Sequence, residues 1–323
     1  MKRLILTVLV SALLAAAFYF LVLKAVDQEA VFSAIRELDV EAWLVILFLS
    51  LLNYVLRFVR WDFYIFRISQ CRIPRLKHLE IYLAGFALTI TPGKVGEAVR
   101  ALYMKPYGVS YPVSFSALFV ERLVDVITVT VLMTSAAFAV PSVRPYSISA
   151  LIVVVLSVLA IRKGYIEGVL GFFSARVSGR WHKLLASLNE IMVGAARLLK
   201  TRVLYAGLAI GVISWGAEGL GLYLILKYLG VEFSLSLAVS IYAVSVLAGA
   251  LSFIPGGLGA AEVVMYSLLH VQGVPAPEAA AATLICRIAT LWFAVVLGIL
   301  PLARLVSSHR ISDEALKGFG HER

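Results

Sequence analysis

The stretch TPGKVGEAVR, residues 91–100, interrupts an apolar segment with a Pro-Gly pair and continues at once into a charged helical pattern. A second stretch, SFIPGGLGAAE at residues 252–262, repeats this arrangement. The similarity extends beyond the breaks, because LAGFALTITPGKVGEAVRALYMKPYGVSYP aligns with LAGALSFIPGGLGAAEVVMYSLLHVQGVPAP. A span with Arg122 follows the first copy, and a span with Arg287 follows the second. Since proline interrupts a helix, the chain is predicted to contain two related units, each built on a broken helix.

The composition indicates a polytopic membrane protein. Of the 323 residues, 61% are hydrophobic and 15% are charged. Several apolar runs approach or exceed the roughly 18 to 20 residues that span a bilayer. Only helices and closed barrels satisfy their backbone groups in lipid, and long runs without alternation are not barrel strands. The fold is therefore predicted to be all-α, with about six transmembrane helices and two re-entrant helical hairpins in inverted-topology repeats.

The charge distribution predicts the orientation of the chain. There are 29 lysines and arginines against 19 acidic residues, and the cations lie mostly in loops beside spans. This pattern is typical of cytoplasmic loops near anionic lipid heads, so no nucleic acid partner is expected. Residues 24–41 are acidic and suit the outer side, residues 162–202 are cationic and suit the inner side, and residues 228–286 contain no Lys or Arg. We expect a cell membrane protein with both termini cytoplasmic.

The predicted organisation follows the two units. The uncharged run at residues 4–23 is expected to be a retained first span rather than a cleaved signal peptide. Residues 235–254 are also long enough to cross alone, so about eight spans stay an alternative to about six. The expected divisions are 1–41 for the first span and outer segment, 42–138 for repeat 1 with a hairpin at 79–105, 139–202 for a linking span and a cytoplasmic interfacial helix at 181–200, 203–302 for repeat 2 with a hairpin at 235–271, and 303–323 for a cytoplasmic tail.

The two broken helices predict an anion-binding site. Opening a helix at membrane depth frees backbone groups that lipid cannot satisfy, so both breaks should line a cavity. Glycine permits close backbone approach, and the N-terminus of the following half-helix attracts phosphate. For either break taken alone, a packed helix kink is the alternative. The break residues assigned to the site are Pro92, Gly93, Lys94, Gly96, Pro255, Gly256, Gly257 and Gly259.

Charged residues lie within or beside the apolar helices. Each costs roughly 2.5 to 3.5 kcal/mol at a helix centre, so these side chains should face the interior and pair with one another. Glu97 and Arg100 are three residues apart, as are Arg122 and Asp125, so each pair shares a helix face. The charges predicted to bind substrate are Lys94, Glu97, Arg100, Glu121, Arg122, Asp125, Glu262 and Arg287.

Other roles for these carboxylates stay open. Glu218 and Glu262 are candidates for carrying a coupling proton, although interior carboxylates are as often structural. Glu121 and Asp125 could equally hold the helices together through ion pairs.

The second predicted span, which begins at Ala42, ends near a polar group of residues. Arg57, Arg60, Trp61 and Asp62 lie there. Long cationic side chains reach toward the membrane surface, and indole rings favour the interface. We interpret these residues as interfacial anchors rather than ligands.

The sequence carries no recognisable enzyme signature. Cys71 and Cys286 are predicted to be free thiols, and GGLGAAE resembles the GxGxxG phosphate motif only distantly. Histidines are scattered at positions 78, 182, 270, 309 and 321. Because no metal-ligand spacing or nucleophile arrangement is present, we expect no catalytic residue, metal or cofactor.

Four motifs occur in a fixed order along the chain. They are PGKVGEAVRALYMK at 92–105, ER-x-x-D at 121–125, PGGLGAAE at 255–262 and R-x-x-TLW at 287–292. Together they resemble the lysylphosphatidylglycerol synthase transmembrane region, also called the flippase-like domain family. In bacterial synthases such a region is fused to a soluble aminoacyl-transferase domain and moves the aminoacylated lipid across the bilayer. The chain ends shortly after its last predicted span, so the resemblance implies a stand-alone lipid-translocating relative. Lys94 departs from the arginine or glycine common in the family, which leaves the headgroup preference open.

We therefore expect a flippase-like transporter for an anionic lipid, either a phospholipid or a polyprenyl-phosphate-linked carrier. The headgroup would lie between the two half-helix N-termini. One alternative is a membrane enzyme that acts on lipid-linked sugar or phosphate, recognised by covalent change in a copurifying lipid. Another is a docking partner that binds a separate lipid-modifying enzyme through residues 162–202, recognised by copurification.

Overall fold

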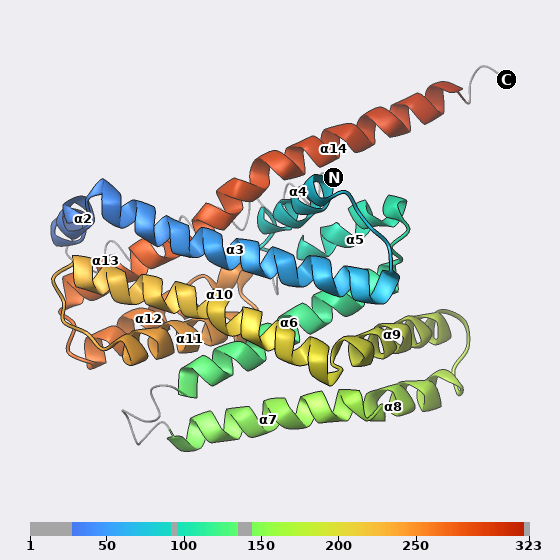
Figure 1. The fold of residues 1–323 in the computed structure, drawn as a ribbon, viewed down its shortest axis with the longest axis horizontal. Coiled ribbons are helices and arrows are strands. Elements are labelled where there is room, and N and C mark those ends of the chain that lie inside the picture. The colour runs from blue at the N-terminus through green and yellow to red at the C-terminus, as the bar shows by residue number, and fades with distance from the viewer. Residues whose placement is uncertain (1–27, 92–95, 135–143, 320–323) are drawn as a thin grey trace.

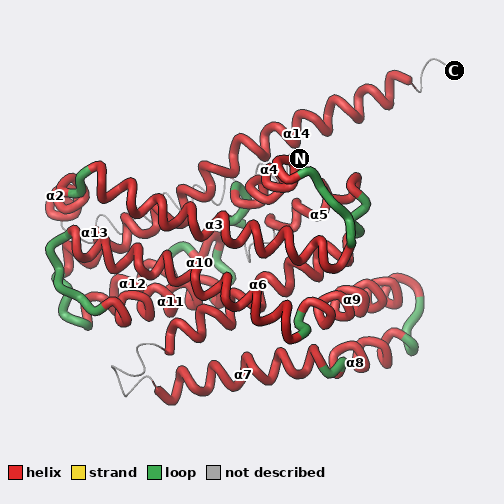
Figure 2. The backbone as a smooth tube through the Cα atoms, viewed as in Figure 1, coloured by secondary structure: helices red, strands yellow, loops and turns green. Residues whose placement is uncertain are grey.

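The computed structural model describes residues 28–91, 96–134 and 144–319 (Figure 1). Within these ranges, every regular element is a helix (Figure 2). The predicted span at 4–23 and the break residues Pro92, Gly93 and Lys94 lie outside the described residues. The elements are α2 (Gln28–Glu37), α3 (Val40–Ser69), α4 (Arg75–Phe86), α5 (Val99–Met104), η2 (Lys105–Tyr107), α6 (Tyr111–Met133), α7 (Arg144–Arg162), α8 (Tyr165–Ser174), α9 (Gly179–Leu198), α10 (Thr201–Tyr228), α11 (Leu235–Leu251), η5 (Pro255–Gly257), α12 (Ala260–Val271), α13 (Ala276–Arg287), the π-helical η6 (Ile288–Trp292) and α14 (Phe293–Phe319).

Three helical stretches of the described chain are long and apolar enough to cross a membrane. They are Val40–Ser69, Thr201–Tyr228 and Ala276–Ser308. The pair Ser147–Arg162 and Tyr165–Ser174, bent by 56°, adds a fourth if it forms one broken span. These helices confirm the predicted all-α, multi-pass membrane fold. The number of spans, the re-entrant placement of the hairpins and the inverted repeats stay predictions.

Helix α3 shows how the polar and apolar side chains are divided. The helix begins after Asp39, whose carboxylate accepts a hydrogen bond from the Ala42 N–H at 2.7 Å. On one side Leu44 and Phe48 are 63% and 62% exposed, whereas Arg57 on another side is buried. A helix in water buries its apolar side chains, so this reversed distribution places the apolar side in lipid and the polar side in the protein.

The first break lies between α4 and α5, which pack against each other. Helix α4 ends at Phe86, and turns continue to Thr91. The Thr91 hydroxyl donates to the Leu88 carbonyl and accepts from the Gly96 N–H, both at 2.7 Å. Thr91 therefore ties the two sides of the break together.

The second break is a tight turn between α11 and α12. Helix α11 ends at Leu251, η5 contains the Pro-Gly pair, and α12 packs back against α11. Gly257 has a φ of +66°, and a Cβ added to it would lie 2.9 Å from Gly249 Cα. Glycine is therefore required at position 257 both for the backbone conformation and for the close contact.

We expect Gly257→Ala to lower the free energy of unfolding by about 2–3 kcal/mol, because alanine would suffer left-handed strain and a backbone clash. Gly230→Ala is the matched control, since Gly230 has a φ of +74° but no atom within 4 Å of an added Cβ. It should cost about 1–2 kcal/mol from strain alone. Thermal unfolding in detergent measures both variants. Equal melting temperatures would contradict the close α11–α12 contact.

The buried apolar residues form two main clusters. One joins the first part of α3 to α11, α12 and α13, and includes Ile46 and Leu222. The other joins the last part of α3 to α4, α6 and α9, and includes Tyr64 and Tyr82. Helices α3 and α10 pack against each other and contribute to both clusters (Figure 1). Helix α6 also contributes to both clusters, so α3, α6 and α10 link them.

Candidate functional site: a buried charge cluster beside a cavity

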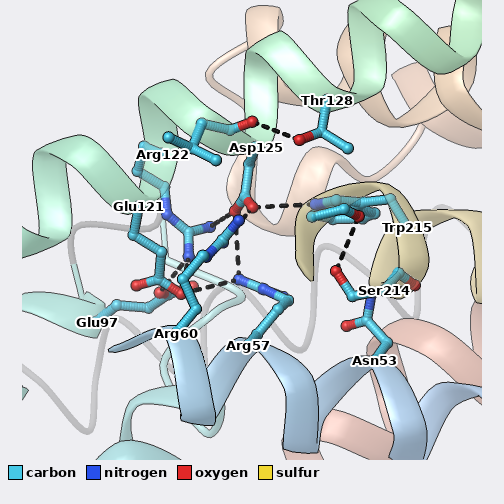
Figure 3. Close-up of polar contacts among 12 residues, drawn as sticks. Asn53, Arg57, Arg60, Glu97, Glu121, Arg122, Asp125, Thr128, Ser214 and Trp215 are labelled. Carbon is cyan, nitrogen blue, oxygen red and sulfur yellow. Dashed lines mark hydrogen bonds and ion pairs between the residues drawn. The ribbon is translucent and has the colours of Figure 1, made fainter. Parts of the chain in front are cut away.

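A group of seven charged residues, here called the charge cluster, lies where α3, residues 96–104 (the α5 segment, which ends in α5) and α6 meet. Figure 3 labels all of its members except Arg100. Helix α3 contributes two arginines, the α5 segment contributes a glutamate and an arginine, and α6 contributes three residues. The members are Arg57, Arg60, Glu97, Arg100, Glu121, Arg122 and Asp125.

Glu121 is fully buried and contacts three arginines, the same number as Asp125. Its carboxylate lies 3.0 Å from Arg100, 3.1 Å from Arg122 and 3.5 Å from Arg57. The Tyr82 hydroxyl donates to it at 3.1 Å. A charge taken out of water is tolerated only with such partners, so Glu121 and its arginines stabilise one another.

Asp125 holds the other side of the charge cluster. It pairs closely with Arg60 and lies 3.5 Å from both Arg57 and Arg122. The Trp215 indole N–H of α10 donates to it at 3.0 Å. The predicted ion pair between Arg122 and Asp125 is therefore present, and it is part of a larger network that also fixes α10.

The Arg100 guanidinium packs against aromatic rings. Its guanidinium lies 4.0 Å from the ring centre of Tyr82 and 5.1 Å from that of Trp61, and it pairs with Glu97 at 3.1 Å as predicted. A Cβ on Gly85 would lie 2.5 Å from Arg100 Nε. Gly85 therefore provides the space that this buried arginine occupies.

A second ion pair lies at the α11–α12 break. Arg287 Nε donates to Glu262 at 2.7 Å, and Arg287 Nη2 donates to the Gly256 carbonyl at 2.8 Å. The other Glu262 oxygen accepts from the Gly259 N–H at 2.8 Å, which caps the start of α12. These contacts satisfy backbone groups that the break would otherwise leave free. An anion at this half-helix N-terminus would have to compete with Glu262.

A cavity of about 580 Å³ lies between these two groups of charges. Its walls come from α3, the α5 segment, α6, α10, α11, η5 and the α13–α14 region. The predicted site residues that line it are Glu97, Arg122, Asp125, Glu218, Gly256, Gly257 and Arg287. The other described site residues, Gly96, Arg100, Glu121, Pro255, Gly259 and Glu262, lie behind or beside these.

The two breaks approach each other at this cavity. Ile90 of the first break packs in one small apolar cluster with Leu258 of the second and with Leu291. A Cβ on Gly256 would lie 3.6 Å from Ile90 Cγ2. The described ends of the two related units therefore meet, although Pro92, Gly93 and Lys94 lie outside the described residues.

The prediction that Arg57, Arg60 and Trp61 anchor the second span at the membrane surface is wrong. Arg57, Arg60 and Trp61 are buried at 6%, 0% and 1% exposure, so they are not interfacial anchors. Arg57 and Arg60 belong to the charge cluster, and the Trp61 indole donates to His78 at 3.0 Å. Asp62 binds the other His78 nitrogen at 2.6 Å. The available signal was a polar stripe at helical spacing, Ser50, Asn53, Arg57 and Arg60.

Two arginines of the charge cluster, Arg57 and Arg122, face the cavity with a free Nε donor. The Nε atoms of Arg57 and Arg122 are buried and have no hydrogen-bond acceptor among the described residues, whereas their Nη2 atoms lie 3.1–3.5 Å from the carboxylates of the charge cluster. Arg60 and Arg100 also carry such nitrogens but do not line the cavity. The Arg122 side chain is 27% exposed, against 0–7% for Arg57, Arg60 and Arg100. A planar guanidinium binds phosphate or carboxylate through two parallel hydrogen bonds. The cavity can therefore receive an oxyanion at Arg57 and Arg122.

The described residues contain no group of three or more His, Cys, Asp or Glu side chains that could hold a metal ion. Cys71 and Cys286, the described cysteines, are free thiols.

Two similar proteins, both UPF0104 membrane proteins, match most of the chain. A UPF0104 membrane protein of Pyrococcus horikoshii is 26% identical over 288 residues, which cover 80% of this chain and 86% of the relative. A UPF0104 membrane protein of Methanothermobacter thermautotrophicus is 29% identical over 287 residues, covering 82% and 84%. The sequence pattern of the lysylphosphatidylglycerol synthase TM region matches residues 4–298. The chain therefore belongs to the lysylphosphatidylglycerol synthase TM region family.

Proposed function

We propose that the protein translocates an anionic lipid, whose headgroup enters the cavity while its tails stay in the bilayer. The observation that carries this proposal is that Arg57 and Arg122 line the cavity and that each keeps a buried Nε donor without an acceptor among the described residues. The membrane fold and the family membership support a lipid as the source of the oxyanion. We place the protein in the cell membrane with both termini cytoplasmic.

The charges around the cavity favour reversible binding. Arg57 and Arg122 already contact Glu121 and Asp125, so an entering phosphate must share these cations with the protein's own carboxylates. Such competition weakens binding relative to that of unpaired arginines. A transporter needs this balance, because a ligand that binds too tightly is not released.

The two apolar clusters suggest how access could alternate. Residues of both clusters line the cavity, and the two breaks meet in a third, small apolar cluster that includes Ile90 and Leu258. A small movement of one break against the other would open the cavity first to one leaflet and then to the other. The anionic headgroup would pass between the breaks with its phosphate held by the arginines.

Reconstituted protein tests the proposal directly. In liposomes that contain phosphatidylglycerol with a fluorescent chain, the wild-type protein is expected to move the label between leaflets. Native mass spectrometry should show the same lipid bound to the purified protein. Absence of both would refute the proposal. A chemically altered lipid would instead support an enzyme that acts on it.

Arg57→Gln is expected to weaken lipid binding by about tenfold to a hundredfold, because a hydrogen bond to a charged group contributes about 1.5–3 kcal/mol. Arg57→Lys keeps the charge but loses the planar fork, so it should bind with intermediate affinity. Arg162→Gln removes an exposed cation of α7 as the control and should bind like the wild type. Melting temperatures show that each variant is folded. Equal affinities for Arg57→Gln and Arg162→Gln would contradict the assigned headgroup site.

A further inference from the structure

Glu218 differs from the other buried carboxylates of the site. It lies in the middle of α10 at 3% exposure and lines the cavity. Its Oε2 accepts one hydrogen bond, from the Ser50 hydroxyl at 3.1 Å. Among the described residues no cation lies within ion-pair distance of it, whereas Glu121, Asp125 and Glu262 each have an arginine partner. Glu218 is therefore a buried carboxylate whose negative charge is not neutralised by a neighbour.

The groups that face Glu218 come from every helix packed against α10. Helix α3 presents Tyr54 and Arg57, helix α11 presents Tyr242, and helix α13 presents Cys286. Arg57 is the only cation among these, and its closest contacts are with Glu121 and Asp125 of the charge cluster. From α6, Asp125 adds a negative charge to the same cavity, and it is bound by three arginines. The surroundings of Glu218 therefore favour its neutral form over its charged form.

The net charge of the site depends on whether Glu218 is protonated. The site contains five arginines and five carboxylates among the described residues. They are Arg57, Arg60, Arg100, Arg122, Arg287, Glu97, Glu121, Asp125, Glu218 and Glu262. With every carboxylate ionised the formal charges cancel, and a proton on Glu218 leaves one positive charge. The protonated site is therefore the one that attracts an anionic headgroup.

We propose that Glu218 takes up one proton when the anionic headgroup enters the cavity and releases it when the headgroup leaves. This inference rests on the proposed lipid translocation and couples that translocation to the movement of one proton. The carboxylate takes the proton from water on the entry side and returns it to water on the exit side, and no bond of the lipid changes. Proton and headgroup binding favour each other, because each reduces the electrostatic cost of the other. Glu262, the other candidate, is engaged by Arg287 and by the start of α12.

Proton binding can be measured without transport. An infrared difference spectrum of the purified protein between about pH 6 and pH 9 contains bands only from groups that gain or lose a proton in this range. Ordinary carboxyl groups titrate near pH 4 and therefore do not contribute. We expect a band from a protonated carboxylic acid that Glu218→Gln removes and Glu218→Asp retains at a shifted position. Glu80→Gln, which alters a partly exposed carboxylate paired with Lys77 at 2.7 Å, should leave the band unchanged. A wild-type spectrum without the band, or a band that persists in Glu218→Gln, would overturn the assignment.

Coupling is measured in liposomes with chain-labelled phosphatidylglycerol and a clamped membrane potential. A pH difference of about one unit should drive the label toward one leaflet by up to about tenfold, the factor that one proton provides per pH unit. Glu218→Gln should bind the lipid but show no response to the gradient. A wild-type rate and distribution independent of the gradient, or a Glu218→Gln variant that still responds, would overturn the coupling. If no labelled lipid moves at all, the proposed function fails, and the infrared result still decides whether Glu218 binds the proton.

Discussion

Glu121→Gln is expected to lower the free energy of unfolding by about 3–5 kcal/mol, the cost of removing one partner from a buried ion pair. Glutamine has nearly the same shape, but it removes the charge that faces Arg57, Arg100 and Arg122 at 3.0–3.5 Å. The Arg100 side chain is 1% exposed and does not line the cavity, so it cannot reach water without rearranging the α3–α5–α6 contact. Denaturant or thermal unfolding in detergent measures the effect.

Glu80→Gln serves as the control for this substitution. Glu80 lies on the neighbouring helix α4 and pairs with Lys77 at 2.7 Å, but the side chains are 21% and 35% exposed. Partly exposed pairs of this kind contribute about 1 kcal/mol or less. If the two variants unfolded at the same temperature, the charge cluster would not be a main source of stability.

Gly298→Val is expected to destabilise the protein by about 3 kcal/mol or more, at the upper end of the range for overpacking. A Cβ at this position would lie 2.3 Å from the Ala87 nitrogen and 2.7 Å from the Leu83 carbonyl oxygen. These are backbone atoms of α4 and the turn after it, so a changed side-chain rotamer cannot relieve the clash. Helix α14 would have to move away from α4, which would disturb the small apolar cluster that contains Ile90 and Val295.

Gly216→Val tests the same change where space is open. Gly216 lies on α10, and nothing lies within 4 Å of a Cβ added there. Since valine is slightly better than glycine in a helix, this variant should unfold within about 0.5 kcal/mol of the wild type. A comparable loss of stability in both variants would show that the α4–α14 contact is looser than described.

The fold class and part of the charge cluster could be predicted from the sequence because both depend on local patterns. Long apolar runs identify membrane helices whatever their neighbours are. Glu97 and Arg100 pair at 3.1 Å, and Arg122 and Asp125 pair at 3.5 Å, as their spacing of three residues predicts. Each Pro-Gly pair also follows the end of a helix, since α4 ends at Phe86, six residues before Pro92, and α11 ends at Leu251, four residues before Pro255.

The roles of Arg57 and Arg60 could not be predicted in the same way. Counting about 20 residues from Ala42 places them near a membrane surface, but α3 runs over 30 residues from Val40 to Ser69. Their positions are therefore interior positions of a long helix. Which partners they meet depends on how α6 packs against α3, and apolar periodicity does not contain that information.

The different roles of Glu218 and Glu262 could not be predicted either, because their partners are distant in the sequence. Ser50 and Glu218 are 168 residues apart, and Glu262 and Arg287 are 25 apart. A list of interior carboxylates treats Glu218 and Glu262 alike. Only the tertiary arrangement distinguishes a glutamate engaged by an arginine and a helix start from one that meets a single hydroxyl.

The enclosure of the charge cluster also determines how the protein responds to dissolved electrolyte. Mobile ions weaken attractions between exposed groups over roughly 10 Å at 0.1 M, but they act little on groups that they cannot surround. Glu121, Arg60 and Arg100 are at most 1% exposed, so their attraction hardly depends on salinity. The α3, α5 and α6 arrangement around the cavity therefore keeps its electrostatic support in dilute and concentrated media alike.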